Sequence, residues 1–330
     1  MKILKILVGL VLLVVVSIVF IYFYRAFKSR SQPDLESWHK PPGEKDLLTR
    51  GSFDTFSDYL AKEKAFLDRL YEEVEVNKPG AFDSYNRYVR TSKSSPYKNG
   101  ENLNCSFQRF PEQGKERGGI LLVHGLTDSP YHLRAIADIF AGNGYYVICI
   151  RLPGHGTSPG ALLDVKWEDW YDAVTFAADM VRKDISKYKD AKFFLGGFST
   201  GGALTLRYVL KKLISAEQVP DKLFLFSPAI AVSPKAELAD WNRLVSWMPF
   251  FEKFKWDGIK PEYDPCKYIS FAKNAGDQIY ELTKENRKLA DKLISKKESL
   301  RDLPPIYAFQ SLVDATVITK DLITLFHDIG

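Results

Sequence analysis

From residue 103 onward, short apolar runs alternate with stretches of helical periodicity, and this alternation constrains the fold more than any other feature of the sequence. The runs have the length and composition of buried strands. Strand–helix alternation is typical of a parallel sheet covered on both faces, so residues 101–330 are predicted to form an α/β domain. The strands are expected at Ile120–Val123, Tyr146–Ile150, Phe193–Leu195, Leu223–Phe226 and Ile306–Phe309, and the helices at about 131–142, 167–187, 200–214 and 318–327.

The alternation is interrupted once, over residues 227–305, by far more chain than a simple crossover needs. An aromatic-rich insertion beside the carboxyl ends of a parallel sheet is a suitable lid over an apolar site. The other interpretation is a helical subdomain that buries these aromatics in its own core. We expect the insertion over about 231–303, with large apolar side chains at Trp241, Trp247, Met248, Phe250, Phe251, Phe254 and Trp256.

Residues 31–100, which precede this domain, contain three different kinds of segment. Residues 31–50 contain three prolines and a glycine in close succession and are predicted to form a linker. Residues 53–76 place apolar side chains at roughly helical spacing, which predicts a helix. Residues 77–100 are rich in Lys, Asn, Ser, Pro and Gly and are expected to be irregular. Residues 31–100 are therefore assigned as a linker and an N-terminal helical segment.

The chain begins with an uncharged apolar run of 19 residues from Ile6 to Tyr24. A helix of that length spans roughly 28 Å, close to the hydrocarbon thickness of a bilayer. Tyr22 and Tyr24 suit a membrane interface, and no A-x-A cleavage pattern ends the run. Residues 1–30 are thus predicted to form an uncleaved transmembrane anchor. A cleaved signal peptide and a buried core helix are the alternatives, and the basic residues on both flanks leave the topology open.

The net charge of +5 arises in this anchor region, because residues 1–30 contain five basic side chains and no acid. The rest of the chain carries 41 basic and 41 acidic side chains. A balanced domain has no electrostatic footprint for nucleic acid, which we exclude as a partner. The three widely spaced cysteines predict neither a disulfide framework nor a zinc site. No metal, nucleotide or flavin motif is evident, so no cofactor is expected.

The strongest chemical signal is Gly197-Phe198-Ser199-Thr200-Gly201, a G-x-S-x-G motif between a predicted strand and a predicted helix. This context is what a nucleophile elbow requires. The serine lies in a sharp turn, so the residues two positions away on either side must lack bulk. The following helix N-terminus favours negative charge that develops nearby. Ser199 is therefore the candidate nucleophile.

Two other loops follow predicted strands at the same edge of the sheet. The first is His124-Gly125-Leu126, which can offer backbone N–H groups to an oxyanion. Thr200, the residue after the candidate nucleophile, would offer another. The second is a Pro-Gly-His-Gly turn that contains His155. His124 and His155 are expected to brace these loops and not to transfer protons.

The three motifs in this order resemble the α/β-hydrolase superfamily, and within it the serine hydrolases grouped with monoacylglycerol lipases, carboxylesterases and the S33 serine aminopeptidases. The resemblance runs from about Gly118 to Thr324 and is weakest in the insertion. It implies an α/β-hydrolase fold in which Ser199 is the nucleophile and the N–H groups of Leu126 and Thr200 form the oxyanion hole. It also implies that Asp314, after the penultimate strand, is the acid of the triad.

The resemblance leaves the catalytic histidine unassigned. Such families place it after one further helix and strand, but only 16 residues follow Asp314. His327 is the one histidine among them, and the predicted crossover helix carries it about 12 Å along its axis, away from the site. We expect that the chain lacks the last strand and helix of the fold, which would make Ile306–Phe309 an uncovered edge strand.

These observations predict a membrane-anchored serine hydrolase that cleaves carboxylic esters of small apolar acyl substrates through an acyl-enzyme on Ser199. Two other functions stay open at this stage. The first is an inactive or truncated hydrolase-fold protein that acts as a binding module, which the unassigned histidine motivates. The second is an acyltransferase with the same nucleophile. The head group, the acyl length and the oligomeric state are not determined by the sequence.

Overall fold

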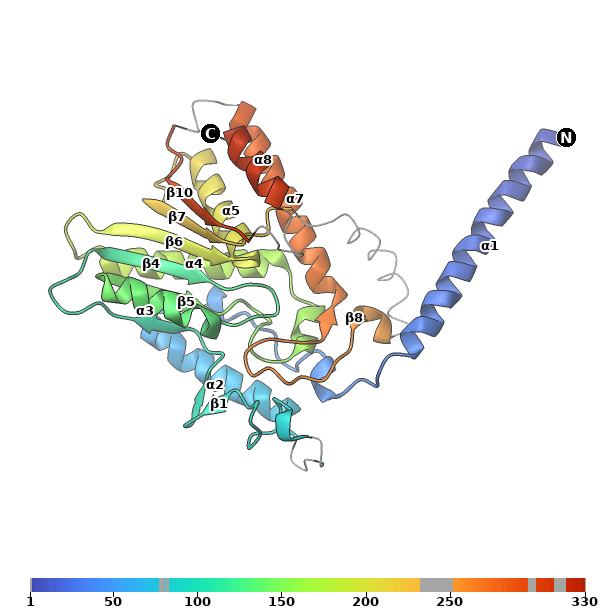
Figure 1. Cartoon of the computed structure of the whole chain (residues 1–330), viewed down its shortest axis with the longest axis horizontal. Helices are drawn as coiled ribbons and strands as arrows, with labels where there is room; N and C mark the ends of the chain where they lie inside the picture. The colour runs from blue at the N-terminus through green and yellow to red at the C-terminus, as the bar shows by residue number, and fades with distance from the viewer. Residues whose placement is uncertain are drawn as a thin grey trace.

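The computed structural model describes residues 2–76, 80, 83–231, 252–295, 301–311 and 319–329. A six-stranded sheet lies at the centre of the domain, in the order β10-β7-β6-β4-β5-β3 (Figure 1). All neighbouring strands are parallel except the edge pair β3–β5. The predicted mostly parallel sheet is therefore confirmed. Its strands are β3 (Phe107–Arg109), β4 (Gly118–Val123), β5 (Tyr145–Ile150), β6 (Lys192–Phe198), β7 (Lys222–Phe226) and β10 (Ile306–Phe309).

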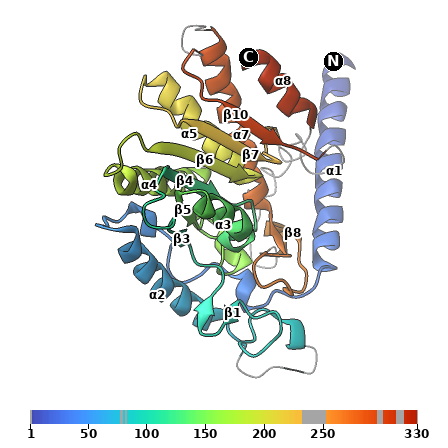
Figure 2. The ribbon, with the colours of Figure 1, turned by 60° about the vertical axis from the view of Figure 1, so that its left-hand side comes forward.

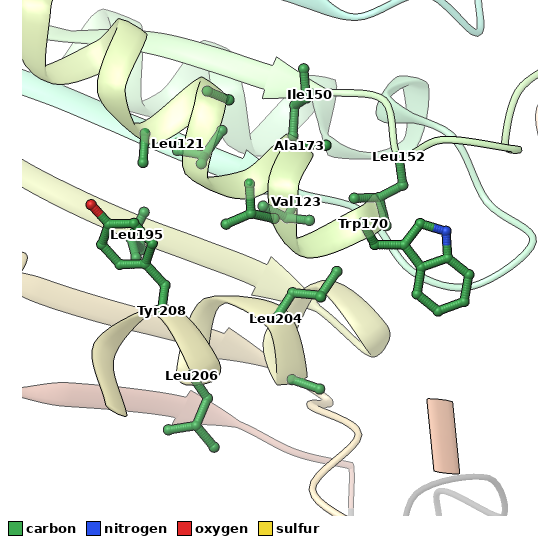
Figure 3. Packing of buried hydrophobic residues seen from close by; sticks show 14 of the residues in the cluster. Leu121, Val123, Ile150, Leu152, Trp170, Ala173, Leu195, Leu204, Leu206 and Tyr208 are labelled. Carbon is green, nitrogen blue, oxygen red and sulfur yellow. The ribbon is translucent and has the colours of Figure 1, made fainter. Parts of the chain in front are cut away.

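The two faces of the sheet bury alternate side chains of the same strands. Leu121 and Val123 of β4 and Leu195 of β6 face α4 (Trp167–Ile185) and α5 (Thr200–Ile214) in the larger cluster (Figure 3). Ile120 and Leu122 of β4 face α3 (Arg134–Gly142) in a smaller cluster on the other side. Because both of their faces are covered, the central strands β4 and β5 are apolar throughout and do not alternate with polar residues.

Two more helices lie outside this sandwich. α7 (Lys273–Ser295) packs along α5, where the side-chain amide of Asn286 donates to the Ala203 carbonyl at 2.8 Å. α8 (Thr319–Ile329) lies beside α7, and Asp328 pairs with Arg287 at 2.9 Å (Figures 1 and 2). The helices predicted at 131–142, 167–187, 200–214 and 318–327 correspond to α3 with the short 3-10 turn before it, α4, α5 and α8.

The described part of the insertion starts at a 3-10 turn, η7 (Glu252–Lys255), and continues through the hairpin of β8 (Trp256–Gly258) and β9 (Phe271–Ala272) into α7. Phe254 and Trp256 are buried, so these two aromatics act as core residues, and Trp256 contacts the ring of His39. The other large residues predicted to form a lid, Trp241, Trp247, Met248, Phe250 and Phe251, lie outside the described residues.

The N-terminal segment packs closely on the domain. α2 (Phe56–Val74) begins at a capping box between Thr55 and Asp58 and buries one face, which includes Phe66 and Leu70. Trp38 and His39, from the stretch predicted as a linker, are 8% and 3% exposed. The remaining short elements of this segment are η1 (Ser37–His39), η2 (Leu48–Arg50), η3 (Asp83–Tyr85), β1 (Tyr97–Lys98) and β2 (Glu101–Asn102).

A buried ionic network joins this segment to the end of β5. Arg151, the residue after β5, is 1% exposed and pairs with Glu63 of α2 at 3.0 Å and with Asp46 at 2.5 Å. Glu63 is fully buried and also accepts hydrogen bonds from the Tyr59 hydroxyl at 3.0 Å and from the Ser106 N–H at 2.6 Å. The network fixes residues 46–63 against the loop after β5, because a buried charge must keep its partners.

α1 (Lys2–Arg30) projects away from the domain in Figure 1, and it contacts η7 of the insertion. Figure 2 shows the same helix from another side. Its segment Lys5–Tyr24 has a mean hydropathy of 3.2, and none of that window is buried. The helix is thus long and apolar enough to cross a membrane, a property that it shares with signal sequences. Tyr22 stacks on Phe254 of η7 with ring centroids 6.1 Å apart.

The buried network generates a stability prediction. Replacing Glu63 with Ala leaves Arg151 with one acidic partner in a buried site, and we expect the free energy of unfolding to fall by about 3 kcal/mol. Lys64→Ala is the matched control, because this neighbouring side chain is 54% exposed and its surface pair with Asp68 contributes little. Urea denaturation followed by tryptophan fluorescence measures both, and equal effects of the two substitutions would contradict the assignment.

Candidate active site

Ser199 occupies a strained turn between β6 and α5. Its φ of 51° and ψ of −114° are rare for a residue with a side chain, and such a conformation costs of order 1–3 kcal/mol. Backbone bonds on both sides hold it. The Ser199 N–H donates to the Phe226 carbonyl at 3.0 Å, and the Ser199 carbonyl accepts from the N–H of Ala203 at 3.2 Å and of Ala229 at 3.0 Å. The side chain is only partly covered, so the turn presents a hydroxyl at the carboxyl edge of the sheet.

The glycines of the motif are required by close backbone approach. A Cβ added to Gly197 would lie 2.3 Å from the Gly201 carbonyl carbon, and one added to Gly201 would lie 2.1 Å from the Val123 oxygen. Backbone atoms cannot move aside as a flexible side chain can. The steric argument made from the sequence therefore holds at both positions.

The loop after β4 lies directly beside Ser199. A Cβ added to Gly125 would be 3.2 Å from the Cβ of Ser199. Leu126 is the next residue of this loop. Thr200 is the first residue of α5, where N–H groups lack intrahelical acceptors. Neither the Leu126 nor the Thr200 N–H donates to a residue that the structure describes. Both are thus available to an oxyanion.

His124 and His155 form hydrogen bonds with the backbone of the loops after β4 and β5. The Leu152 N–H donates to His124 Nε2 at 3.0 Å, so the proton resides on Nδ1, which lies 2.8 Å from the Gly125 carbonyl. Burial lowers the pKa of His124 well below its usual 6.5, and it lowers the pKa of His155 to about 4. His155 Nδ1 lies 3.1 Å from the Pro153 carbonyl. Neutral buried rings of this kind hold the two loops in place.

The structure brings together one pair that the sequence reasoning did not single out. Asp128 and His132 form an ion pair across one turn, just after the Leu126 loop. The hydrogen bond to Asp128 raises the pKa of His132 above its usual 6.5, and the ring is 43% exposed. The spacing of four residues between an acid and a histidine before a helix is the sequence signal that would have pointed to it.

The remaining members of the predicted site lie elsewhere. Asp314 falls outside the described residues. His327, near the end of α8, is 89% exposed; its Nδ1 lies 3.7 Å from Oδ1 of Asp328, whose other oxygen pairs with Arg287 of α7. Within the described ranges, no cluster of three or more His, Cys, Asp or Glu side chains could hold a metal ion.

The Asp128–His132 pair predicts a pH dependence of stability. Because the folded pKa of His132 is raised, its contribution is complete below pH 6.5 and is lost as the pH rises through the raised value. The melting temperature of His132→Gln should therefore lie below that of the wild type at pH 5.5 and approach it at pH 9. His327→Gln, which alters an exposed ring, is the control. A His132→Gln deficit that is the same at both pH values would contradict this role.

Comparisons with known proteins agree with this geometry. The profile of the family described as serine aminopeptidase, S33 (Hydrolase_4), matches residues 114–303, more than half of the chain. The chain is also similar to a thermostable monoacylglycerol lipase from Bacillus sp. (strain H-257), with 36% identity over 88 residues, 27% of this chain. That alignment spans 33% of the relative, about a third of its length.

A solved structure from a study of LipS and LipT, two metagenome-derived lipolytic enzymes, shares the fold, with a TM-score of 0.51 and 21% identity. The alignment covers 69% of this chain and 83% of that one. The predicted α/β-hydrolase fold is thus confirmed. The chain belongs to the serine aminopeptidase S33 family of α/β-hydrolase serine hydrolases.

Proposed function

We propose that this protein hydrolyses carboxylic esters of apolar acyl groups through an acyl-enzyme on Ser199. The observation that carries the proposal is the strained strand-to-helix turn that presents this hydroxyl beside the loop of Leu126. A residue with a side chain keeps such a φ only when its surroundings impose it, and strain of this kind concentrates at functional sites. The same turn places Thr200 at the start of α5, where its N–H can donate a hydrogen bond to the oxyanion of the reacting ester.

The reaction follows from these positions. The Ser199 Oγ attacks the ester carbonyl and gives up its proton to a base, and the carbonyl oxygen becomes an oxyanion that the N–H groups of Leu126 and Thr200 stabilise. Each such donor contributes on the order of 10²–10³ in kcat. Collapse of the tetrahedral intermediate expels the alcohol, which takes up a proton, and leaves the acyl group on Oγ. Water then releases the acid by the same two steps.

Asp314 is proposed as the acid that orients the base. Of the five histidines, His39, His124 and His155 are buried within the fold. The rings of His132 and His327 are exposed, so both residues are tested as the base in the labelling experiment below.

Apolar surroundings of Ser199 support an apolar acyl substrate. Phe198, the residue before it, is 38% exposed, and Phe226, whose carbonyl holds Ser199, stacks on Phe309 at 5.4 Å. Phe309 is itself 56% exposed. The similarity to a monoacylglycerol lipase and to lipolytic enzymes points to the same class of substrate.

α1 is proposed as an uncleaved membrane anchor. The length of its 20-residue apolar span, Lys5–Tyr24, matches the thickness of a bilayer. Tyr22 lies in the last turn of that span and stacks on Phe254. A cleaved segment would have no reason to contribute a packed aromatic to the folded domain. The anchor would keep the hydrolase near apolar esters, which partition into membranes.

The nucleophile is tested by labelling with a fluorophosphonate, which requires an activated serine. We expect the wild type to label and to hydrolyse p-nitrophenyl butyrate, and Ser199→Ala to lose labelling and at least about 10³-fold in kcat. Ser215→Ala, an exposed serine at the end of α5, should behave as the wild type. Labelling that survives Ser199→Ala would overturn the proposal. Loss of labelling in His132→Gln or His327→Gln would identify the base.

The anchor is tested by alkaline carbonate extraction of membranes and by mass spectrometry of the N-terminus. We expect the intact chain in the pellet. The double substitution Leu12→Arg, Val15→Arg places two charges at mid-span, at a cost of about 2.5–3.5 kcal/mol each, and should release the protein. Leu12→Ala, Val15→Ala is the matched control and should remain in the pellet. A mature N-terminus beyond residue 24 would show a signal peptide instead.

A further inference from the structure

The loop that carries Leu126 contains a second strained residue. Thr127 has a φ of 60°, an unfavourable value for a β-branched residue, and its side chain is 6% exposed. Within the loop, the Asp128 N–H makes a long turn bond to the Gly125 carbonyl, 3.3 Å, and the Ser129 N–H donates to the Asp128 carboxylate at 2.9 Å. A shorter contact comes from outside it: the N–H of Tyr268 donates to the Thr127 carbonyl at 2.8 Å.

The side chain of Tyr268 reaches the other loop at this edge. Its hydroxyl accepts from the Thr157 N–H at 2.7 Å and donates to the Gly154 carbonyl at 3.1 Å. Both of these residues belong to the turn after β5. The residue is 3% exposed, and burial raises the pKa of its hydroxyl to about 12, so the group stays protonated and able to donate. One residue thus bonds the loop after β4 through its backbone and the loop after β5 through its side chain.

The segment around Tyr268 is itself held firmly. The carboxylate of Glu262 accepts from the N–H groups of Ser270 at 2.7 Å and of Ile269 at 3.1 Å. Arg87 supports the segment from the N-terminal part of the chain: its N–H donates to the Glu262 carbonyl at 2.9 Å, and its guanidinium lies 5.1 Å from the Tyr268 ring centroid. Tyr268 therefore contacts the two loops from a rigid base.

We infer that Tyr268 is a positioning residue that holds the oxyanion hole in place, an inference that rests on the proposed function of Ser199. Leu126 directly precedes Thr127, so any displacement of Thr127 moves the Leu126 N–H relative to the Ser199 hydroxyl. Misplacement of a group by about 1 Å costs up to about 10²-fold in rate. The part of the insertion that follows β8 thus has a role in catalysis without contacting the substrate.

The test compares Tyr268→Phe with Tyr263→Phe in the detergent-solubilised chain of 330 residues. Tyr268→Phe removes the hydroxyl and with it the bonds to Thr157 and Gly154; the residue is then held less firmly, and we expect its backbone N–H bond to Thr127 to loosen as a consequence. Tyr263, in the same segment with 56% of its surface exposed, serves as the matched control. For Tyr268→Phe we expect kcat on p-nitrophenyl butyrate and the fluorophosphonate labelling rate to fall about tenfold, with KM within about twofold. Backbone amides of residues 124–129 should exchange hydrogen faster, and those of α4 should not.

The outcomes separate this inference from the proposed function. If the wild type neither labels nor hydrolyses esters, the function of Ser199 fails, and exchange in residues 124–129 still decides whether Tyr268 holds the loop. If the wild type is active, an unchanged kcat in Tyr268→Phe overturns the inference, and so does unchanged exchange in the loop. A uniform loss of stability with no change specific to the loop also overturns it. Should Tyr268→Phe fail to fold, Glu262→Gln, which weakens the base of the same segment, is expected to give the same pattern of effects in milder form.

Discussion

The parallel register between β4 and β6 is the constraint on which the rest of this site depends. Val123 lies opposite Gly197 in that register, so the two strands end together and their following loops meet. The consequence is visible at atomic scale: a Cβ on Gly201 would clash with the Val123 oxygen, and one on Gly125 would make tight contacts of 3.0–3.2 Å with Phe198 and Ser199. A slip of one residue would turn every side chain of a strand to the opposite face and separate Ser199 from Leu126.

Polar contacts between distant parts of the chain then hold this edge of the sheet. Arg151 and Glu63 join α2 to the end of β5, and Tyr268 joins the loops after β4 and β5 to the insertion. Each contact links residues at least 88 positions apart in the sequence. Buried charges and hydroxyls are costly unless they are fully paired, so they specify one arrangement of the loops more narrowly than apolar packing does. The N-terminal segment is for this reason part of the framework of the site and does more than connect α1 to the domain.

The sheet and the nucleophile motif could be predicted from the sequence because the signals of both extend over only a few neighbouring residues. Each predicted strand is present. β4, β5 and β6 are buried along nearly their whole length and are apolar for that reason, whereas β10 lies at the edge of the sheet and is mostly exposed. The edge strand β3 (Phe107–Arg109) and the long helix α7 were not predicted. β3 is short and only half-buried, and α7 is an amphipathic helix whose partner, α5, is fixed only when the domain assembles. The role of residues 31–50 was also not apparent, because their burial depends on partners far along the chain.

By itself, the sequence determined that the chain has an apolar N-terminal helix, a mostly parallel α/β sheet and a serine at a glycine-flanked turn after a strand. These properties follow from local composition and spacing, which act over a few residues. Only the tertiary structure decided that Gly125 lies against Ser199, that the Leu152 N–H is the partner of His124 and that Tyr268 bonds two loops. The physical reason is that hydrogen-bond partners and burial are set by which distant segments meet, and no local pattern encodes that meeting.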